Sequence, residues 1–588
     1  MKLKNKQELM RLVRYILDRY RAWLGVVIIC ILVSSAASIT STLFIKTLID
    51  DYVMPLTQVD NPEFASLAQA LFKLALVLLL GVACSYIYNL IMIYVSHGTL
   101  LSLRKRLFQR MEKLSIGYFD SHPHGQIMSI YTNDVDSLRQ MVGQALPMTF
   151  STIITLIITL TSMIVLSIPL TIVSLVLAGV MMRVTMALGM RSRSHFMTQQ
   201  VKLAEVNGFI EEMMTGQKVV KVFCHEQAAK DQFAVINEQL RQAVDQANKI
   251  ANIVMPVNGN LGNLGYVLIA VVGATLSLTG VVSLSIGTLV SFLTLNRNFM
   301  QPIAMLSQQI NTVINASVGA ERVFGLMDQE PEIDEGKIQM KRDEVKGTFQ
   351  LSHVDFGYIP EKQVLHDISL NVSSNQKIAF VGGTGAGKTS IINLINRFYE
   401  YQGGSILLDG IPITDISKNS LRSCLGIVLQ DTHLFTGTVM QNIRYGRLEA
   451  SDEECREAAR LIGSDLFIRR LPDGYDTLLE NGGRNLSQGE RQLLAITRAA
   501  VANPPVMIMD EATSNIDTHS EQLVQRGMDQ LMKGRTTFVI AHRLSTVRSA
   551  DVINVLENGR IIESGTHDEL LALRGKYYQL YTGTGSLS

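Results

Sequence analysis

The chain has 588 residues, of which 47% are hydrophobic and 18% are charged, and its mean hydropathy is +0.21. Soluble globular proteins carry roughly 25% charged residues, so this composition favours a membrane protein. The high hydrophobic content excludes an intrinsically disordered chain, and the net charge of +1 gives no support for a nucleic-acid-binding protein. The five cysteines form no C-x-x-C pair, which argues against a disulfide scaffold or a zinc ribbon.

The first predicted element is an amphipathic helix at about residues 8–22, where apolar side chains at helical spacing alternate with basic ones. Such a helix is expected to lie on a membrane surface as an elbow before the first span. A solvated surface helix is the alternative.

Four long stretches then contain no Asp, Glu, Lys or Arg, and a bilayer span needs about 20 mostly apolar residues. The first two stretches have room for one span each, and the last two for two spans each with a tight turn between them. We therefore predict an all-α transmembrane domain over residues 1–325. Its six spans are expected at about 22–45, 74–97, 145–167, 168–190, 255–279 and 280–305.

Charges outside the spans predict the orientation. Residues 1–21 carry seven Lys and Arg, whereas the loop 46–73 is mainly acidic. By the positive-inside rule the N-terminus is cytoplasmic, and six spans return the chain to the cytoplasm. We expect a multi-pass protein of a bacterial inner (plasma) membrane. The polar segments 104–139 and 191–249 are expected to be long cytoplasmic helical extensions with short tip helices near 118–124 and 215–226.

Residues 326–346 are predicted to form a linker, because the segment is acidic and contains Pro331. From residue 347 to residue 588 short apolar strands alternate with helices and Gly-rich turns, which is typical of a soluble α/β domain.

This second domain contains a phosphate-binding loop of the form G-x-x-x-x-G-K-[ST] between the predicted strand 377–381 and the predicted helix 390–399. Its glycines allow backbone N–H groups to surround phosphate oxygens, and the helix N-terminus adds a positive dipole. Lys388 is expected to contact the β- and γ-phosphates of ATP, and the Thr389 hydroxyl is expected to bind Mg²⁺. The candidate ATP-binding residues of this loop are Gly382, Gly383, Thr384, Gly385, Ala386, Gly387, Lys388, Thr389 and Ser390.

Two further motifs follow. The predicted strand 506–509 ends in Asp510, a candidate Mg²⁺ ligand, and Glu511, a candidate general base for the attacking water. Between the two sites, Ser487 has the character of an N-cap for a helix predicted over 491–502, which forms a second potential anion site. This segment consists of Leu486, Ser487, Gln488, Gly489 and Glu490.

In this order, the motifs resemble the nucleotide-binding domain of ABC transporters, and the six preceding spans resemble the exporter type with fused domains. The resemblance covers essentially the whole chain and implies an α/β P-loop ABC ATPase that hydrolyses ATP with Mg²⁺. It implies that Tyr358 stacks on adenine, that Gln430 contacts Mg²⁺ together with Thr389 and Asp510, and that His542 holds the γ-phosphate. Glu511, His542 and Gln430 are then the catalytic residues, residues 486–490 are the signature that contacts the partner's ATP, and Ser514 and Asp517 belong to the D-loop.

The family's ATP site combines a phosphate loop from one nucleotide domain with a signature from another, and this chain has one of each. The resemblance therefore implies a dimer. The signature departs from the usual LSGGQ at Gln488 and Glu490, and the D-loop reads Ser-Asn-Ile-Asp. This D-loop resembles the catalytically complete half of bacterial heterodimeric exporters, so we favour a heterodimer with a second half-transporter chain over a homodimer.

The expected function is ATP-driven export of amphipathic small molecules, as in multidrug efflux, by alternating access through the lipid membrane. The alternatives are a homodimeric lipid or peptide exporter or flippase, and an ATP-gated channel or regulator. The polar residues of the late spans are candidates for the transport path: Asn258, Asn260, Asn263, Asn296, Arg297, Asn298 and Gln301.

Overall fold

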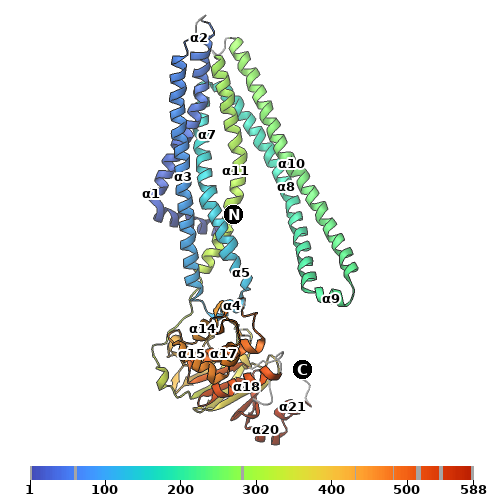
Figure 1. Ribbon diagram of the computed structural model, residues 1–588. Coiled ribbons are helices and arrows are strands. Elements are labelled where there is room, and N and C mark those ends of the chain that lie inside the picture. Colours follow the sequence, from blue (N-terminus) through green and yellow to red (C-terminus); the bar gives the residue numbers. More distant parts are fainter. Residues whose placement is uncertain are drawn as a thin grey trace. The chain divides into compact units, whose positions relative to one another are not determined.

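The computed structural model describes residues 3–58, 63–279, 284–359, 361–430, 432–480, 482–510, 518–541 and 547–583. The chain divides into two compact units. The first unit comprises Met1–Glu112 and His124–Gln329, and the second comprises Lys113–Pro123 and Glu330–Ser588. The first is helical and the second is an α/β unit, which confirms the predicted fold class (Figure 1).

Helices make up the first unit. They are α1 (Leu3–Thr47), η1 (Leu48–Val53), α2 (Met54–Leu56), α3 (Ala65–Met111), α5 (His124–Ser129), η2 (Ile130–Asp134), α6 (Val135–Gln140), η3 (Met141–Ala145), α7 (Leu146–Leu166), α8 (Ile168–Thr215), α9 (Gln217–Val222), α10 (Glu226–Leu278) and α11 (Ile286–Met327).

Among the described residues, five helical runs are long and apolar enough to cross a membrane. They are Gln7–Leu56, Ala65–Met111, His124–Leu166, Ile168–Thr215 and Glu226–Leu278, and the first five predicted spans fall on them in order. The sixth predicted span, 280–305, starts on residues outside the described ranges and continues into α11, so it stays a prediction.

The N-terminal segment of α1 is a helix of its own, separated from the rest of α1 by a kink. The backbone leaves helical geometry at Tyr20 (φ −122°, ψ 24°), close to the predicted end of the elbow at residue 22. The segment is attached to the far end of α11, because the Arg11 guanidinium donates two hydrogen bonds of 2.6 and 2.9 Å to the Asp328 carboxylate. The same guanidinium lies 4.5 Å from the centre of the Phe324 ring.

Helices α8 and α10 form a long pair that diverges from α1, α3, α7 and α11 and is joined at its tip by α9 (Figure 1). Ser167, in extended conformation, ends α7 and begins the turn into α8. At about 1.5 Å per residue, the 48 residues of α8 extend about 72 Å, more than twice the roughly 30 Å of a bilayer core. The pair therefore reaches well beyond a membrane at one end.

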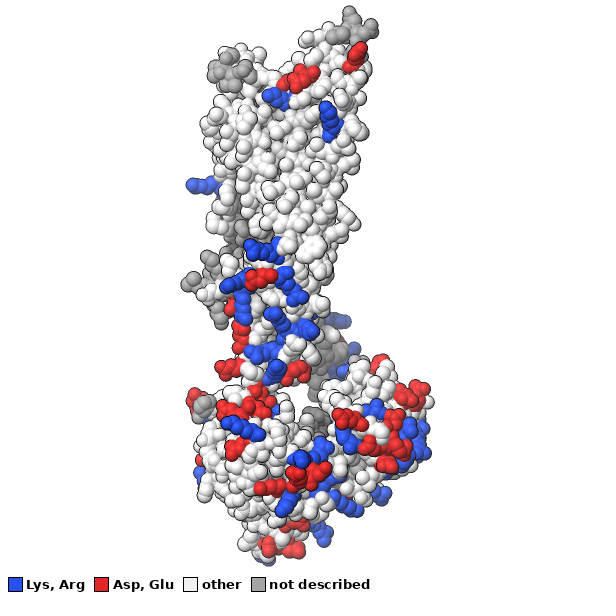
Figure 2. All heavy atoms as spheres, turned by 90° about the vertical axis from the view of Figure 1, so that its left-hand side faces the viewer, with Lys and Arg blue, Asp and Glu red and all other residues white. Residues whose placement is uncertain are grey.

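One face of the helical unit carries a broad band almost free of charged side chains, and Lys and Arg side chains gather beyond one end of this band (Figure 2). Such a band with basic residues at one border is the arrangement expected of a protein in a bilayer whose basic end faces the cytoplasm.

The second unit contains two larger sheets. The four-stranded sheet has the order β2-β1-β4-β5 and is antiparallel, with β1 (Phe349–Phe356), β2 (Leu365–Val372), β4 (Gly403–Leu408) and β5 (Ile411–Pro412). The six-stranded sheet has the order β12-β11-β3-β10-β9-β6 and is parallel except for β12. Its strands are β3 (Lys377–Gly382), β6 (Leu425–Val428), β9 (Val506–Asp510), β10 (Thr536–Ile540), β11 (Val552–Glu557) and β12 (Arg560–Gly565).

Helices and short elements complete this unit. They are α4 (Ile116–Ser121), η4 (Arg342–Glu344), α12 (Lys388–Ile395), α13 (Lys418–Ser423), β7 (Gly437–Thr438), α14 (Val439–Arg444), α15 (Asp452–Ile462), α16 (Asp465–Ile468), η5 (Gly474–Asp476), β8 (Leu478–Leu479), α17 (Gln488–Ala502), α18 (Thr518–Met532), α20 (His567–Leu573) and α21 (Lys576–Thr582). One hydrophobic core cluster contains residues of both sheets. In it the Phe538 ring lies 5.2 Å from the Phe349 ring and 6.3 Å from the Phe380 ring, measured between ring centres.

Most of the predicted linker, from residue 330 onward, belongs to the second compact unit. Glu332 receives two hydrogen bonds from Arg422, at 2.9 and 2.5 Å, and lies 3.2 Å from the Lys418 amine. Burial favours the neutral form of Glu332, but the charge and hydrogen bonds of Arg422 outweigh it and hold the pKa of Glu332 below its ordinary value. The acidic residues of this segment therefore fix it to the α/β unit.

Candidate nucleotide site

The carboxyl ends of the parallel strands bring the predicted motifs to one edge of the six-stranded sheet. Ile540, the last residue of β10, is level with Phe380 in β3 and with Asp510 in β9. Gln430 follows the end of β6 by two residues. Because parallel strands all end at the same edge, the phosphate loop, Asp510 and Gln430 meet there, as ligand sites of open α/β sheets do.

A pocket of about 360 Å³ occupies this edge. It is lined by Tyr358, Val364, Thr384, Gly385, Ala386, Gly387, Lys388, Thr389, Ser390, Gln430, Asp510 and Ile540. The structure thus brings together most of the predicted ATP-binding residues with all three predicted Mg²⁺ ligands, Thr389, Gln430 and Asp510. Gly382 and Gly383 are not among the described lining residues, but their carbonyl oxygens accept hydrogen bonds from Lys388.

The phosphate loop depends on glycine at two positions. Gly385 and Gly387 have φ values of +81° and +104°, in the left-handed region. A Cβ at Gly387 would lie 2.6 Å from the Leu365 side chain, so a larger residue would also clash. Helix α12 begins directly after Gly387, two residues earlier than predicted, and its first three residues line the pocket.

The Lys388 side chain is buried and its Nζ donates hydrogen bonds of 2.8 Å to the carbonyl oxygens of Gly382 and Gly383. Burial lowers the pKa of Lys388, and the negative charge of Asp510 opposes that shift. The ammonium group is therefore held inside the loop, where a polyphosphate bound to the surrounding N–H groups would be within its reach.

Three oxygen-bearing side chains line the same pocket: the Thr389 hydroxyl, the Gln430 amide and the Asp510 carboxylate. Hydroxyl, amide and carboxylate oxygens are the donors that Mg²⁺ accepts, and Mg²⁺ in such sites takes only a few of its ligands from the protein. The donor set fits Mg²⁺.

Tyr358 lies at the mouth of the pocket with 44% of its surface exposed. Its hydroxyl lies 3.1 Å from the Ser390 hydroxyl, and the Asn393 side-chain amide donates a 3.1 Å hydrogen bond to it. Both partners belong to α12, so the ring is positioned by the helix that starts at the phosphate loop.

The signature segment is placed at the start of α17. Ser487 is the N-cap, and it forms a capping box in which the Glu490 N–H donates to the Ser487 hydroxyl and the Ser487 N–H donates to the Glu490 carboxylate. This explains why α17 begins at Gln488, three residues before the predicted start. Leu486 and Gly489 are buried, whereas Ser487 and Gln488 are exposed. None of these five residues is among those described as lining the phosphate pocket.

Four of the predicted site residues, Glu511, Ser514, Asp517 and His542, lie outside the described residues. The residue before Glu511 is Asp510, which lines the pocket, and Ala541, which follows β10, precedes His542.

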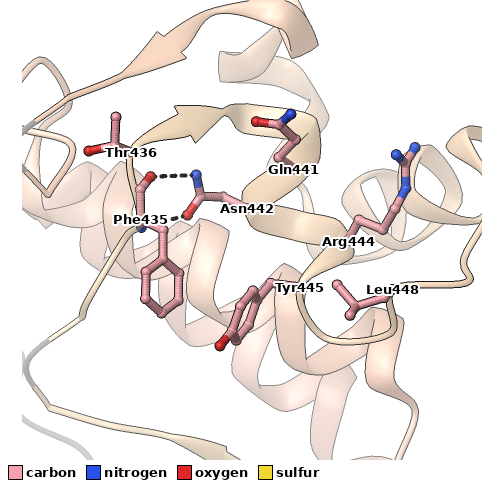
Figure 3. Close-up of a pocket in the computed structure, with 7 residues that line it drawn as sticks. All are labelled: Phe435, Thr436, Gln441, Asn442, Arg444, Tyr445 and Leu448. Atoms are coloured by element: carbon pink, nitrogen blue, oxygen red, sulfur yellow. Dashed lines mark hydrogen bonds between the residues drawn. The ribbon is translucent and has the colours of Figure 1, made fainter. Parts of the chain in front are cut away.

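A further pocket, of about 280 Å³, lies on the same unit and was not predicted from sequence (Figure 3). It is lined by Phe435, Thr436, Gln441, Asn442, Arg444, Tyr445 and Leu448. The Asn442 side chain accepts from the Phe435 N–H at 2.9 Å and donates to the Phe435 carbonyl at 2.8 Å. The Phe435 and Tyr445 rings, which line the pocket, have their centres 4.6 Å apart and form an exposed aromatic surface.

Comparison with known proteins agrees with this arrangement. Residues 24–303 match the family model of the ABC transporter transmembrane region, and residues 365–514 match the family model described as ABC transporter. The chain is 38% identical over 576 residues to the uncharacterized ABC transporter ATP-binding protein YfiC of Bacillus subtilis, covering 98% of this chain and 94% of that protein.

Two relatives have names that state a substrate. A fatty acid ABC transporter ATP-binding/permease protein of Mycobacterium bovis is 39% identical over 82% of this chain and 76% of its own length. An ATP-dependent lipid A-core flippase of Syntrophus aciditrophicus is 35% identical over 95% of this chain and 91% of its own length. The chain therefore belongs to the ABC transporter family as an exporter-type half-transporter, an ATP-hydrolysing integral membrane protein whose helical transmembrane region is fused to its ATPase region.

Proposed function

We propose that this half-transporter works as a dimer that uses ATP to export amphipathic small molecules by alternating access. One observation carries the proposal: the phosphate pocket and the signature lie on separate parts of the chain, and the signature does not line the pocket. A second chain is needed to bring a signature to each phosphate loop.

In each composite site, Lys388 and the N–H groups of the phosphate loop bind the phosphates, and Tyr358 stacks on the base. Thr389, Asp510 and Gln430 hold Mg²⁺, which neutralises charge on the phosphates when bound. Glu511 takes a proton from the attacking water and His542 contacts the γ-phosphate. The partner's signature contributes the N-terminus of α17 to the same phosphates, and Ser514 and Asp517 belong to the D-loop that the family resemblance implies.

Closure and opening of the two ATPase regions then move the membrane helices. ATP joins the two halves, and hydrolysis to ADP and phosphate leaves two anions that repel each other and allow the halves to separate. Nucleotide shifts the equilibrium between inward- and outward-facing states only to the extent that it binds them with different affinity.

The α8–α10 pair supports the dimer. Its tip exposes large apolar side chains, with Val219 60%, Val222 77% and Phe223 65% exposed. Apolar side chains at a predicted cytoplasmic tip need a partner surface, and the aromatic surface of Phe435 and Tyr445 in Figure 3 has a matching character. As the family resemblance implies, the tip of one chain binds the ATPase region of the other.

Polar groups in the helical unit support an amphipathic substrate. Asn296 is buried, and no hydrogen-bond partner is described for its side-chain oxygen. Asn258 accepts a 2.8 Å hydrogen bond from Thr185, and Asn298 donates to Thr42 at 3.2 Å. The other candidate path residues, Asn260, Asn263, Arg297 and Gln301, are exposed. Isolated polar groups among apolar helices suit a molecule with a polar head and an apolar body. The relatives named for a fatty acid and for lipid A favour the lipid class.

Transport by inside-out vesicles tests the function. We expect ATP-dependent accumulation of a fluorescent fatty acid or phospholipid against its gradient, and loss of accumulation when hydrolysis is blocked. Accumulation of cationic drugs but not of lipids would favour the multidrug efflux that the sequence predicts over the lipid class. Equilibration without accumulation would indicate a gated channel and contradict the proposal.

Purification of this chain alone in lipid tests the partner. We expect, from the D-loop sequence, that the chain alone is a monomer or hydrolyses ATP poorly, and that co-expression with a second half-transporter restores hydrolysis. A stable homodimer of twice the 65.1 kDa chain mass with strong hydrolysis would contradict the heterodimer and support the homodimeric alternative.

A further inference from the structure

We propose that Tyr399 links the adenine end of the nucleotide pocket to helix α4, so that α4 responds to the base of the bound nucleotide and not only to its phosphates. Helix α4 (Ile116–Ser121) comes from the loop between α3 and α7, yet it belongs to the same compact unit as the nucleotide pocket. The proposal rests on the proposed ATP site and adds a route by which its occupancy reaches the transmembrane region.

The first step is a contact between aromatic rings. The Tyr399 ring lies edge-to-face against Tyr358, with ring centres 4.9 Å apart and planes at 88°. Both rings also pack against Phe356, at 4.9 Å from Tyr358 and 5.9 Å from Tyr399. Phe356 is buried at the end of β1, so it forms a fixed base for the two tyrosines. A base stacking on Tyr358 therefore acts on a ring that is in direct contact with Tyr399.

The second step is a hydrogen bond to α4. The Tyr399 hydroxyl donates to the Asp120 carboxylate at 2.5 Å. Burial, and then the bond to Asp120, raise the pKa of Tyr399 well above its ordinary value, so the hydroxyl keeps its proton and remains a donor at neutral pH. Gly117, one turn earlier in α4, permits this approach, because a Cβ there would lie 3.1 Å from Tyr399 Cε1.

Hydrogen bonds hold the backbone around Tyr399. A movement of the Tyr399 ring is therefore passed on to α4 and is not absorbed by a local change of the backbone. Arg397 is in the left-handed region (φ +50°) and its guanidinium donates to the carbonyl oxygens of Ile413 and Ile416, at 3.1 and 3.0 Å. On the other side, the Glu332 N–H donates a 2.7 Å hydrogen bond to the carbonyl oxygen of Lys113, just before α4. Helix α4 is thus attached to the α/β unit at one backbone point and one side-chain point.

Tyr358 also connects to α12, because its hydroxyl hydrogen-bonds with Ser390 and Asn393. Phosphates at the start of α12 would therefore act on the hydroxyl, whereas a stacked base would act on the ring. Phosphates alone engage the loop and the start of α12. The adenine ring engages Tyr358 itself, and through it Tyr399 and Asp120. We therefore expect a nucleotide and a bare polyphosphate to act differently on α4, with Tyr399 as a positioning residue.

Hydrogen exchange of the full-length protein in lipid nanodiscs tests this, with ADP and pyrophosphate as probes that need no hydrolysis. We expect ADP to slow exchange both in the phosphate loop, 382–389, and in residues 113–123, and pyrophosphate to slow it only in the loop. Tyr399→Phe, which removes only the hydroxyl, should abolish the ADP effect at 113–123 and keep the effect at the loop.

Tyr475→Phe is the matched control, because Tyr475 makes a similar 2.7 Å hydrogen bond to Asp465 away from α4, and it should keep both effects. Asp120→Ala removes the acceptor instead and should reproduce Tyr399→Phe if that variant folds poorly. Equal protection of 113–123 by pyrophosphate, or a full ADP effect in both Tyr399→Phe and Asp120→Ala, would overturn the link. If ADP protects the loop but not 113–123 in the unmodified protein, the link alone is wrong. Without protection of the loop by ADP, the proposed nucleotide site itself is wrong.

Discussion

Replacement of Lys388 by methionine is expected to reduce ATP hydrolysis by about 10²–10³-fold, the cost of removing one preorganised charge donor from a phosphoryl-transfer site. Methionine keeps much of the length and apolar volume of lysine, so the fold should be retained, while the ammonium group that hydrogen-bonds inside the loop is lost. Phosphate release by the protein in lipid, together with binding of a fluorescent ATP analogue, measures the effect. The rate of hydrolysis and the affinity for the ATP analogue should both fall, because the phosphates lose a charge contact in the ground state and in the transition state.

Lys533→Met provides the control for this substitution. Lys533 is exposed and lies outside the nucleotide pocket, so its replacement removes a positive charge from the same unit without touching the loop. Hydrolysis should stay at the unmodified rate in that variant. Hydrolysis at the unmodified rate in Lys388→Met would remove Lys388 from phosphate binding.

Replacement of Glu511 by glutamine is expected to lower turnover by about 10²–10⁴-fold, the range by which a general base contributes, and to leave ATP binding intact. Glutamine is nearly isosteric with glutamate but cannot take a proton from water. The preceding Asp510 and the phosphate loop, which line the pocket, are unchanged, so nucleotide should still bind. Because hydrolysis no longer separates the halves, the ATP-bound dimer of this chain with its co-expressed partner should accumulate, and particle mass in the presence of ATP measures this.

Glu449→Gln serves as the matched variant, since Glu449 is exposed in the loop before α15. It should have normal turnover and no ATP-stabilised dimer. Turnover retained in Glu511→Gln would exclude Glu511 as the base, and loss of ATP binding would show that this carboxylate acts in the binding step.

The nucleotide site could be predicted in outline because its chemistry lies in local patterns. The glycines of the phosphate loop need particular backbone angles, and positions 385 and 387 have them. The ends of the strands can also be predicted from local patterns, and parallel pairing then brings these ends to one edge of the sheet.

The predicted ends of the helices were less accurate than the predicted motifs. Helix α12 was expected over 390–399 but ends at Ile395, because Arg397 adopts a left-handed conformation that no helix continues through.

Contacts between distant segments could not be predicted. Tyr399 and Asp120 are 279 positions apart, and neither residue stands in a pattern that points to the other. The attachment of Glu332 to Arg422 is similar, since an acidic segment with a proline is equally typical of a free linker. One wall of the pocket in Figure 3 is held by Asn442, whose side chain forms two hydrogen bonds with the backbone of Phe435. No pattern in the sequence predicts these two hydrogen bonds.

The turn at the tip of the α8–α10 pair offers a chemical handle. Of the five cysteines, Cys30, Cys424 and Cys455 are buried and Cys84 is half-buried, whereas Cys224 is exposed directly after Phe223. An exposed thiol reacts with water-soluble maleimides far faster than a buried one. The reason is that the thiol must lose its proton to form the attacking thiolate, and the maleimide must be able to reach that thiolate. The natural sequence therefore permits a single fluorophore or spin label at the tip, without a cysteine-free background, and the label's mobility would follow the binding and release of this tip through the transport cycle.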